Sequence, residues 1–144
     1  MFELDTDARL SAWAQHRAQL DQSADPLRDL WNFWREAPFV PINLDIDPYY
    51  QASWPTPWEV IVRNRYDDFT KALMIGWTLK LTHRFAKSHI EVRTMLDKER
   101  NRVYNIIFID KEWAINYNDN GPVAQEDIPD SFLLENLIEV SPPR

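Results

Sequence analysis

The sequence predicts a single α+β domain over residues 1–144, with a central buried helix packed on a three-stranded antiparallel meander. Three observations support this. The length suits one domain. Apolar residues follow helical spacing through most of the first half of the chain, and the pattern changes to the alternation of strands after residue 90. We therefore divide the domain into N-terminal helices (1–37), a proline-aromatic loop (38–56) and an α+β core (57–140).

Two helices are predicted in the N-terminal part. Residues 7–22 carry a narrow apolar stripe that includes Trp13 and Leu20, so this helix is expected at the surface of the domain. Asp25 followed by Pro26 is a typical helix start, because the carboxylate caps free N–H groups and proline fits the first position. The next helix then presents one continuous apolar face, formed by Leu27, Leu30, Trp31 and Trp34.

The proline-aromatic loop combines several prolines with aromatic residues, including Phe39, Tyr49, Tyr50 and Trp54. Its proline content predicts irregular structure. A long loop that is both stiff and apolar either packs down across the core or forms a recognition surface.

The core begins with a capping box at Thr56-Pro57-Trp58-Glu59, which predicts a helix of about two turns. Asp67 or Asp68 then caps a longer helix over residues 68–83. Its middle is apolar on nearly every side, so other elements should enclose it. Gly76 lowers its intrinsic stability by about 1 kcal/mol, which a close contact with another helix or strand would explain.

Three strands follow the long helix. Residues 90–96 alternate between apolar and polar side chains, whereas residues 102–110 are apolar on both faces and predict the central strand. A tight turn at 110–112 leads into a third strand over 113–118, and an Asn-Gly-Pro sequence ends it. Residues 129–138 predict a short last helix carrying Phe132, Leu133 and Leu137.

Composition excludes several classes of function. The chain has no cysteine, so thiol catalysis, disulfides and thiolate metal sites are excluded. No apolar run approaches the length of a membrane span, and the acidic N-terminus lacks a signal-peptide pattern. These features predict a cytoplasmic protein without membrane contact.

The net charge of −7 is unevenly distributed. Residues 63–111 hold eleven lysine and arginine residues against six acidic ones, whereas both flanks are strongly acidic. Either the flanks fold back over the basic middle, or the asymmetry orients a partner. The overall charge disfavours nucleic-acid binding. The basic residues considered for phosphate contact are Lys80, Arg84, Lys87, His89, Arg93, Lys98, Arg100 and Arg102.

No complete catalytic or metal site is predicted, and no cofactor. His83 and His89 are six residues apart, a spacing that places them on different helical faces, and no carboxylate pair completes a metal site with them. Asp45 and Asp47 could act as an acid and a base, but no third group joins them. The asparagines of residues 116–120 form a turn whose neutral amides do not suit calcium.

The order of capped helix, central buried helix and meander over residues 64–118 resembles the core of transglutaminase-like and papain-like cysteine hydrolases. In that pattern Tyr66 or Asp67 falls at the place of the nucleophilic cysteine, Asn105 near the histidine and Asn116 near the aspartate. Neither a nucleophile nor a general base is left in those positions. The resemblance therefore implies a degenerate scaffold that is retained for binding.

A second resemblance extends over residues 38–122. The segments SWPTPWEVI and NRYDDFTKALMIGWTLKLTHRF are similar to uncharacterised small proteins of large contractile-tailed bacteriophages. This resemblance implies a phage accessory protein in the host cytoplasm or a virion-associated protein.

Together these features predict a non-enzymatic interaction protein that acts through a protein partner or through self-association. The expected anchors of its contact surface are Tyr49, Tyr50, Trp54 and Trp58, since large aromatic side chains dominate binding energy in many interfaces. Two alternatives stay open. One is the degenerate hydrolase scaffold, and the other is an acidic mimic of nucleic acid.

Overall fold

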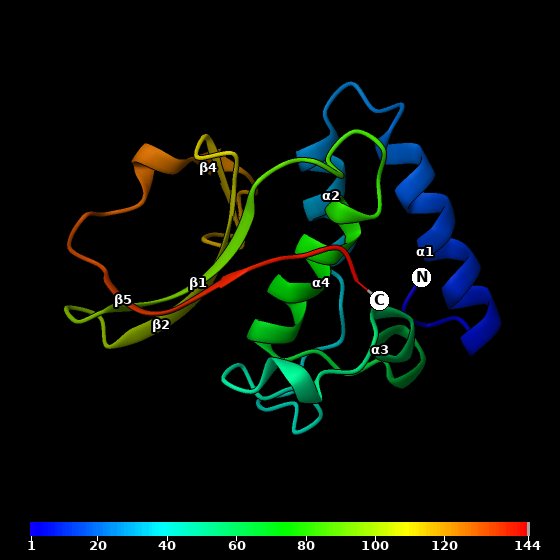
Figure 1. Ribbon diagram of the computed structural model, residues 1–144, viewed down its shortest axis with the longest axis horizontal. Helices are drawn as coiled ribbons and strands as arrows, with labels where there is room; N and C mark the ends of the chain where they lie inside the picture. The colour runs from blue at the N-terminus through cyan, green and yellow to red at the C-terminus, as the bar shows by residue number, and fades with distance from the viewer. Residues whose placement is uncertain (144) are drawn as a thin grey trace.

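A five-stranded antiparallel sheet packs against the helix α4 (Asp68–Lys80), and the remaining helices lie on the other side of α4 (Figure 1). This arrangement comes from a computed structural model that describes residues 1–143. The α+β class is the one that the sequence predicts. The central position of α4 also agrees with the prediction, since ten of its thirteen residues are buried.

The three other α-helices are α1 (Thr6–Leu20), α2 (Pro26–Trp34) and α3 (Pro57–Arg63). Their starts follow the predicted local chemistry. Asp25 accepts a hydrogen bond from the backbone N–H of Arg28, and Thr56 forms both halves of a capping box with Glu59. Of the two candidates for the cap of α4, Asp67 is the capping residue, and it accepts from the N–H of Thr70. These local predictions are confirmed.

The close contact predicted at Gly76 is present. A Cβ atom at this position would lie 3.0 Å and 3.3 Å from the two methyl groups of Val140. Val140 follows the last strand, and its backbone N–H donates to the carbonyl of Ile90. The last segment of the chain therefore crosses α4 at the one position where the helix has no side chain.

We predict that Gly76→Ala changes the free energy of unfolding with opposite signs in two backgrounds. In the parent, overpacking against the stiff Val140 side chain should outweigh the gain of about 1 kcal/mol in helix propensity, for a net loss of about 1 kcal/mol. In a Val140→Ala background the clash is relieved, so Gly76→Ala should stabilise. Urea unfolding of the four proteins measures this, and the same sign in both backgrounds would contradict it.

The sheet has the strand order β4-β3-β2-β1-β5. Its strands are β1 (Ile90–Asp97), β2 (Arg102–Ile109), β3 (Trp113–Ile115), β4 (Val123–Ala124) and β5 (Leu133–Glu139). The doubly apolar strand β2 is the middle strand, as its sequence predicts. The turn between β2 and β3 places Asp110 and Lys111 at φ of 53° and 60°, the left-handed conformation that tight hairpins require.

The predicted three-stranded meander is present as β1, β2 and β3, but β4 and β5 extend it to five strands, and the helix predicted over residues 129–138 is wrong. The segment forms β5, which pairs antiparallel with β1 from Glu91↔Glu139 to Leu96↔Leu133. Leucine and glutamate favour a helix intrinsically, but the free edge of β1 offers a row of backbone hydrogen bonds that a helix would leave without partners. Tertiary pairing therefore overrides local propensity.

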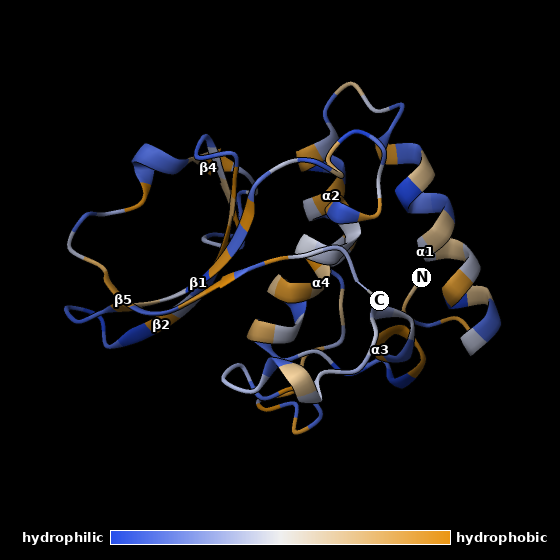
Figure 2. Ribbon diagram, viewed as in Figure 1, coloured by the Kyte–Doolittle hydropathy of each residue, from blue (hydrophilic) through white to orange (hydrophobic). Residues whose placement is uncertain are grey.

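Apolar side chains are buried on both faces of the sheet. The larger cluster lies between the sheet and the helices, around α4. The smaller cluster lies on the opposite face, where Tyr104 stacks on Phe132 and contacts Tyr117. The segment that includes β4 and the 3₁₀ turn Gln125–Asp127 arches over this face (Figure 2). A second 3₁₀ turn, Gln51–Ser53, interrupts the loop before α3.

Candidate functional site

The four predicted contact residues have different environments. Tyr49 and Tyr50 are largely exposed, at 73% and 61% of their full surface. Trp54 is buried in the main core, edge-on to Phe69 and Trp77. Trp58 is partly exposed, at 37% of its full surface, and packs edge-on against Trp13. The structure therefore brings Tyr49 and Tyr50 to the surface, and uses Trp54 to anchor the loop that carries them.

Residues 39–50 form an exposed apolar loop, which we call the 39–50 loop. The loop connects α2 to α3 in the chain, and Figure 2 shows hydrophobic residues along it. Its large exposed side chains range from 61% to 92% exposure, and Leu44 is the most exposed of the large hydrophobic residues in the described part of the chain. They are Phe39, Ile42, Leu44, Tyr49 and Tyr50. An exposed apolar group of this size is typical of an interaction surface.

Polar contacts hold the 39–50 loop in place on the body of the protein. The side chain of the buried Asn43 donates to the carbonyl of Arg65 and to the hydroxyl of Thr70, and its backbone N–H donates to Asp67. Asp45 forms an ion pair with Arg65 at 2.9 Å. The indole N–H of Trp54 donates to the carbonyl of residue 47. The loop therefore presents its apolar side chains from a fixed backbone.

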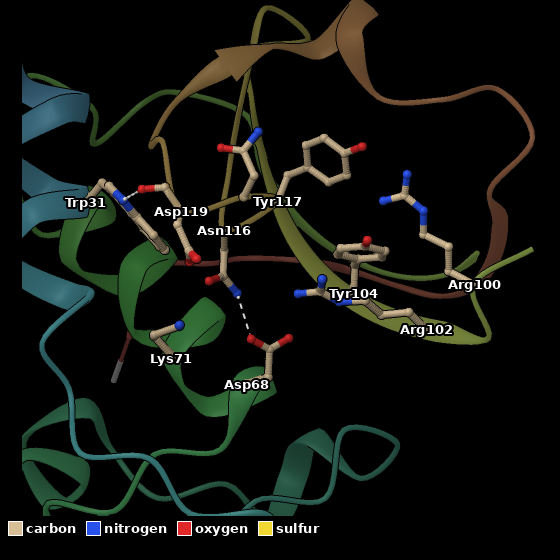
Figure 3. A pocket seen from close by; sticks show the side chains of 10 residues that line it. Trp31, Asp68, Lys71, Arg100, Arg102, Tyr104, Asn116, Tyr117 and Asp119 are labelled. Carbon is tan, nitrogen blue, oxygen red and sulfur yellow. Dashed lines mark hydrogen bonds between the residues drawn. The ribbon is translucent and has the colours of Figure 1, made fainter.

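A second polar site lies where the start of α4 meets the sheet. One oxygen of Asp68 accepts hydrogen bonds from the backbone and side-chain N–H groups of Asn105, at 3.2 Å and 3.0 Å. Its other oxygen accepts from the side chain of Asn116 at 3.2 Å (Figure 3). The same side-chain N–H₂ group of Asn116 also donates to the carbonyl of Asn105. Asn116 is buried and has a φ of 74°, a conformation that asparagine tolerates better than most residues.

Asn105 and Asn116 were both singled out from the element order, but their partner on the helix was not. The residue that meets them is Asp68, one position after Asp67. Tyr66 lies instead in the aromatic core beside Phe2 and Trp34, and burial raises the pKa of its hydroxyl well above its ordinary value. Asp67 is occupied by the helix cap and by the N–H of Asn43.

A cavity of about 260 Å³ opens beside Asp68, and we call it the α4 cavity. Its walls come from four parts of the chain: Trp31 of α2, the first turn of α4, the start of β2 with the turn before it, and the residues after β3. The side chains that matter for its chemistry are Asp68, Lys71, Arg100, Arg102, Tyr104 and Asn116. Lys71 and Arg102 point into the same space from opposite sides (Figure 3).

Other titratable residues considered from the sequence, such as Asp45 and His16, form contacts that stabilise the fold. Asp45 is held by Arg65 and Arg63. His16 is buried and stacks on Phe33, with ring centroids 3.9 Å apart. Residues 1–143 hold no group of three or more histidine, cysteine, aspartate or glutamate side chains that could bind a metal ion together.

Sequence reasoning missed Lys71 and Asp68 as members of one site with Arg100 and Arg102. Two local signals point in the right direction. Asp68 and Lys71 are three residues apart, hence on one helix face, and Arg100 and Arg102 are two residues apart, in the turn before β2 and at its first position. Nothing local indicates that this helix face and this strand end meet, because the packing of α4 on β2 is a long-range contact.

No family model, no curated protein and no solved structure matches the chain. The resemblances to cysteine hydrolases and to phage proteins therefore stay predictions. Within residues 1–143, no helix combines the length and the apolar character needed to cross a membrane.

Proposed function

We propose that this chain is a non-enzymatic interaction protein that binds a protein partner through the 39–50 loop. The observation that carries the proposal is the presence of five large, exposed apolar side chains on one loop whose backbone is held by hydrogen bonds and an ion pair. A fixed loop loses little conformational entropy on binding, so more of the apolar contact energy appears as affinity.

Charge favours a foreign partner over a second copy. The chain carries a net charge of −7, and residues 1–62, which include the loop, hold ten acidic residues against four basic ones. Two copies that met through this surface would repel each other, whereas a partner with basic groups around an apolar pocket would be attracted. We therefore assign the loop to a partner protein with a basic rim.

The test compares the parent with a Leu44→Ser/Tyr49→Ser variant. The control is Leu134→Ser, which replaces an apolar residue of 54% exposure on β5, outside the loop. A protein captured from an extract of the source organism is purified, and its affinity for each form is measured by calorimetry. We expect the loop variant to weaken binding at least tenfold and the control to change it less than twofold.

Three outcomes would overturn this proposal. The first is a captured partner that binds the loop variant as tightly as the parent. The second is a loop-dependent dimer in light scattering at increasing concentration, which would assign the surface to self-association. The third is loop-dependent flotation with lipid vesicles, which would assign it to a membrane surface.

The hydrogen-bonded group of Asp68, Asn105 and Asn116 favours a second candidate function, a degenerate hydrolase-type scaffold retained for binding. These residues join a helix start to two strands in the element order of those enzymes. Acyl transfer requires a nucleophile, and the side-chain amides of Asn105 and Asn116 do not supply one. If this candidate is right, an experimental structure with a ligand soaked into the crystal should show it in the α4 cavity.

A further inference from the structure

The α4 cavity contains three cations without anionic partners. Among residues 1–143, no carboxylate lies within 4 Å of the charged nitrogens of Lys71, Arg100 or Arg102. Among the lysines and arginines of residues 63–111, ion pairs are formed by Arg63, Arg65 and Arg93. Lys71, Arg100 and Arg102 are distinguished from the other cations without ion pairs by lining one cavity. Three like charges that share one cavity repel each other, so an added anion would be stabilised there.

Aromatic rings hold two of these cations in place. The guanidinium of Arg102 lies 4.6 Å from the centre of the Tyr104 ring, and the ammonium of Lys71 lies 5.4 Å from that of Trp31. The Tyr104 ring also stacks on Phe132, at a centroid distance of 5.2 Å. The rings therefore orient the two cations, and a ligand in the cavity would interact with the guanidinium and ammonium groups.

The acidic groups of the cavity do not cancel this charge. Asp68 already accepts three N–H groups, from Asn105 and Asn116. Asp119 also lines the cavity, and its backbone carbonyl accepts from the indole N–H of Trp31. The cavity therefore combines three cations with two carboxylates, and one of these, Asp68, already accepts three N–H groups. Its hydrogen-bond donors outnumber its free acceptors. An acceptor-rich anion fits this surplus.

We propose that the α4 cavity binds a small phosphate monoester, with its phosphoryl group between Lys71 and Arg102, which point toward each other, and with Arg100 farther along the cavity wall beside Tyr117 (Figure 3). A phosphoryl group carries a charge of about −1.5 to −2 at pH 7 and three strong acceptor oxygens, whereas a single carboxylate offers one charge and two. Arginine guanidinium groups match phosphate oxygens in pairs. The volume of about 260 Å³ leaves room for a short organic group beside the phosphoryl group.

The probes for the test are inorganic phosphate, glycerol phosphate and succinate, titrated into the full chain by calorimetry in phosphate-free buffer with 150 mM salt. We expect one saturable site for glycerol phosphate, with an affinity at least tenfold higher than for succinate. Inorganic phosphate should compete for it. Equal affinity for succinate would overturn the assignment to a phosphoryl group, and no saturable binding of either phosphate probe would overturn the site.

Variants locate the site. Arg102→Gln and Lys71→Gln remove cations from different elements, and each is expected to weaken glycerol phosphate binding at least tenfold. The matched control is Lys98→Gln, an exposed lysine in the same turn as Arg100 but outside the cavity, which should change the affinity less than twofold. An equal loss in the control would show unspecific charge attraction. Binding of a phosphopeptide without binding of glycerol phosphate would assign the cavity to a protein ligand and overturn the proposal.

Discussion

Lowering the pH from 7 to 4 is expected to cost the parent protein about 3 kcal/mol more stability than a His16→Phe variant. The pKa of His16 is lowered from 6.5 to about 4, chiefly by burial, while Asp29 raises it and Arg17 makes a smaller contribution that lowers it. Within residues 1–143, the Nε2 atom of this histidine has no hydrogen-bond partner. The imidazole is therefore neutral in the folded protein at neutral pH.

The direction follows from proton binding. Between pH 6.5 and about 4 the unfolded chain binds a proton at His16 that the folded chain does not bind. Stability from this residue is therefore complete above pH 6.5 and is lost as the pH falls toward 4. Acidic residues add their own acid dependence to every variant, so the difference between variants is the quantity to compare.

Urea unfolding at pH 7 and pH 4 measures this effect. Phenylalanine keeps a ring of similar shape against Phe33, so the variant should fold. The control is His83→Gln, which replaces an exposed histidine and should follow the parent. Equal pH dependence in the parent and in His16→Phe would show that His16 does not stay neutral in the folded state.

Replacing Asp68 by alanine is expected to lower the free energy of unfolding by about 3 kcal/mol. The change removes an acceptor of three N–H groups, two of them from Asn105 and one from Asn116. Hydrogen bonds to a charged group contribute roughly 1.5–3 kcal/mol each, and water entering the α4 cavity can replace part of that. Asp68→Asn keeps one acceptor oxygen and should lose about 1 kcal/mol.

Asp7→Ala is the matched control, because Asp7 is also in the first turn of a helix but is exposed. Its loss should stay below about 1 kcal/mol, the usual contribution of an acidic residue to the helix dipole. Thermal and urea unfolding compare the three variants. Equal small losses at both positions would contradict a structural role for the contacts of Asp68 with the sheet.

The starts of the helices and the class of the fold were determined by sequence alone. A capping residue satisfies N–H groups within its own turn, so Asp25 and Thr56 act through contacts that span only a few residues. For α4 the sequence left Asp67 and Asp68 as alternatives, and the structure shows that Asp67 is the cap. The enclosed position of α4 and the central position of β2 are equally evident, because each is apolar on all sides. Even the role of Gly76 could be predicted in kind, although its partner could not.

Only the tertiary structure decided what depends on distant pairing. Residues 133–139 favour a helix by composition and became a strand because β1 offered them an edge. Trp54 and Tyr49 belong to the same aromatic loop, yet one packs beside Trp77 and the other faces solvent. Asp68 meets Asn116 across 48 residues of chain. A local sequence pattern indicates which face of a helix or strand a side chain lies on. The energy of a contact between distant segments depends on the residues of both segments, and these meet only in the folded chain.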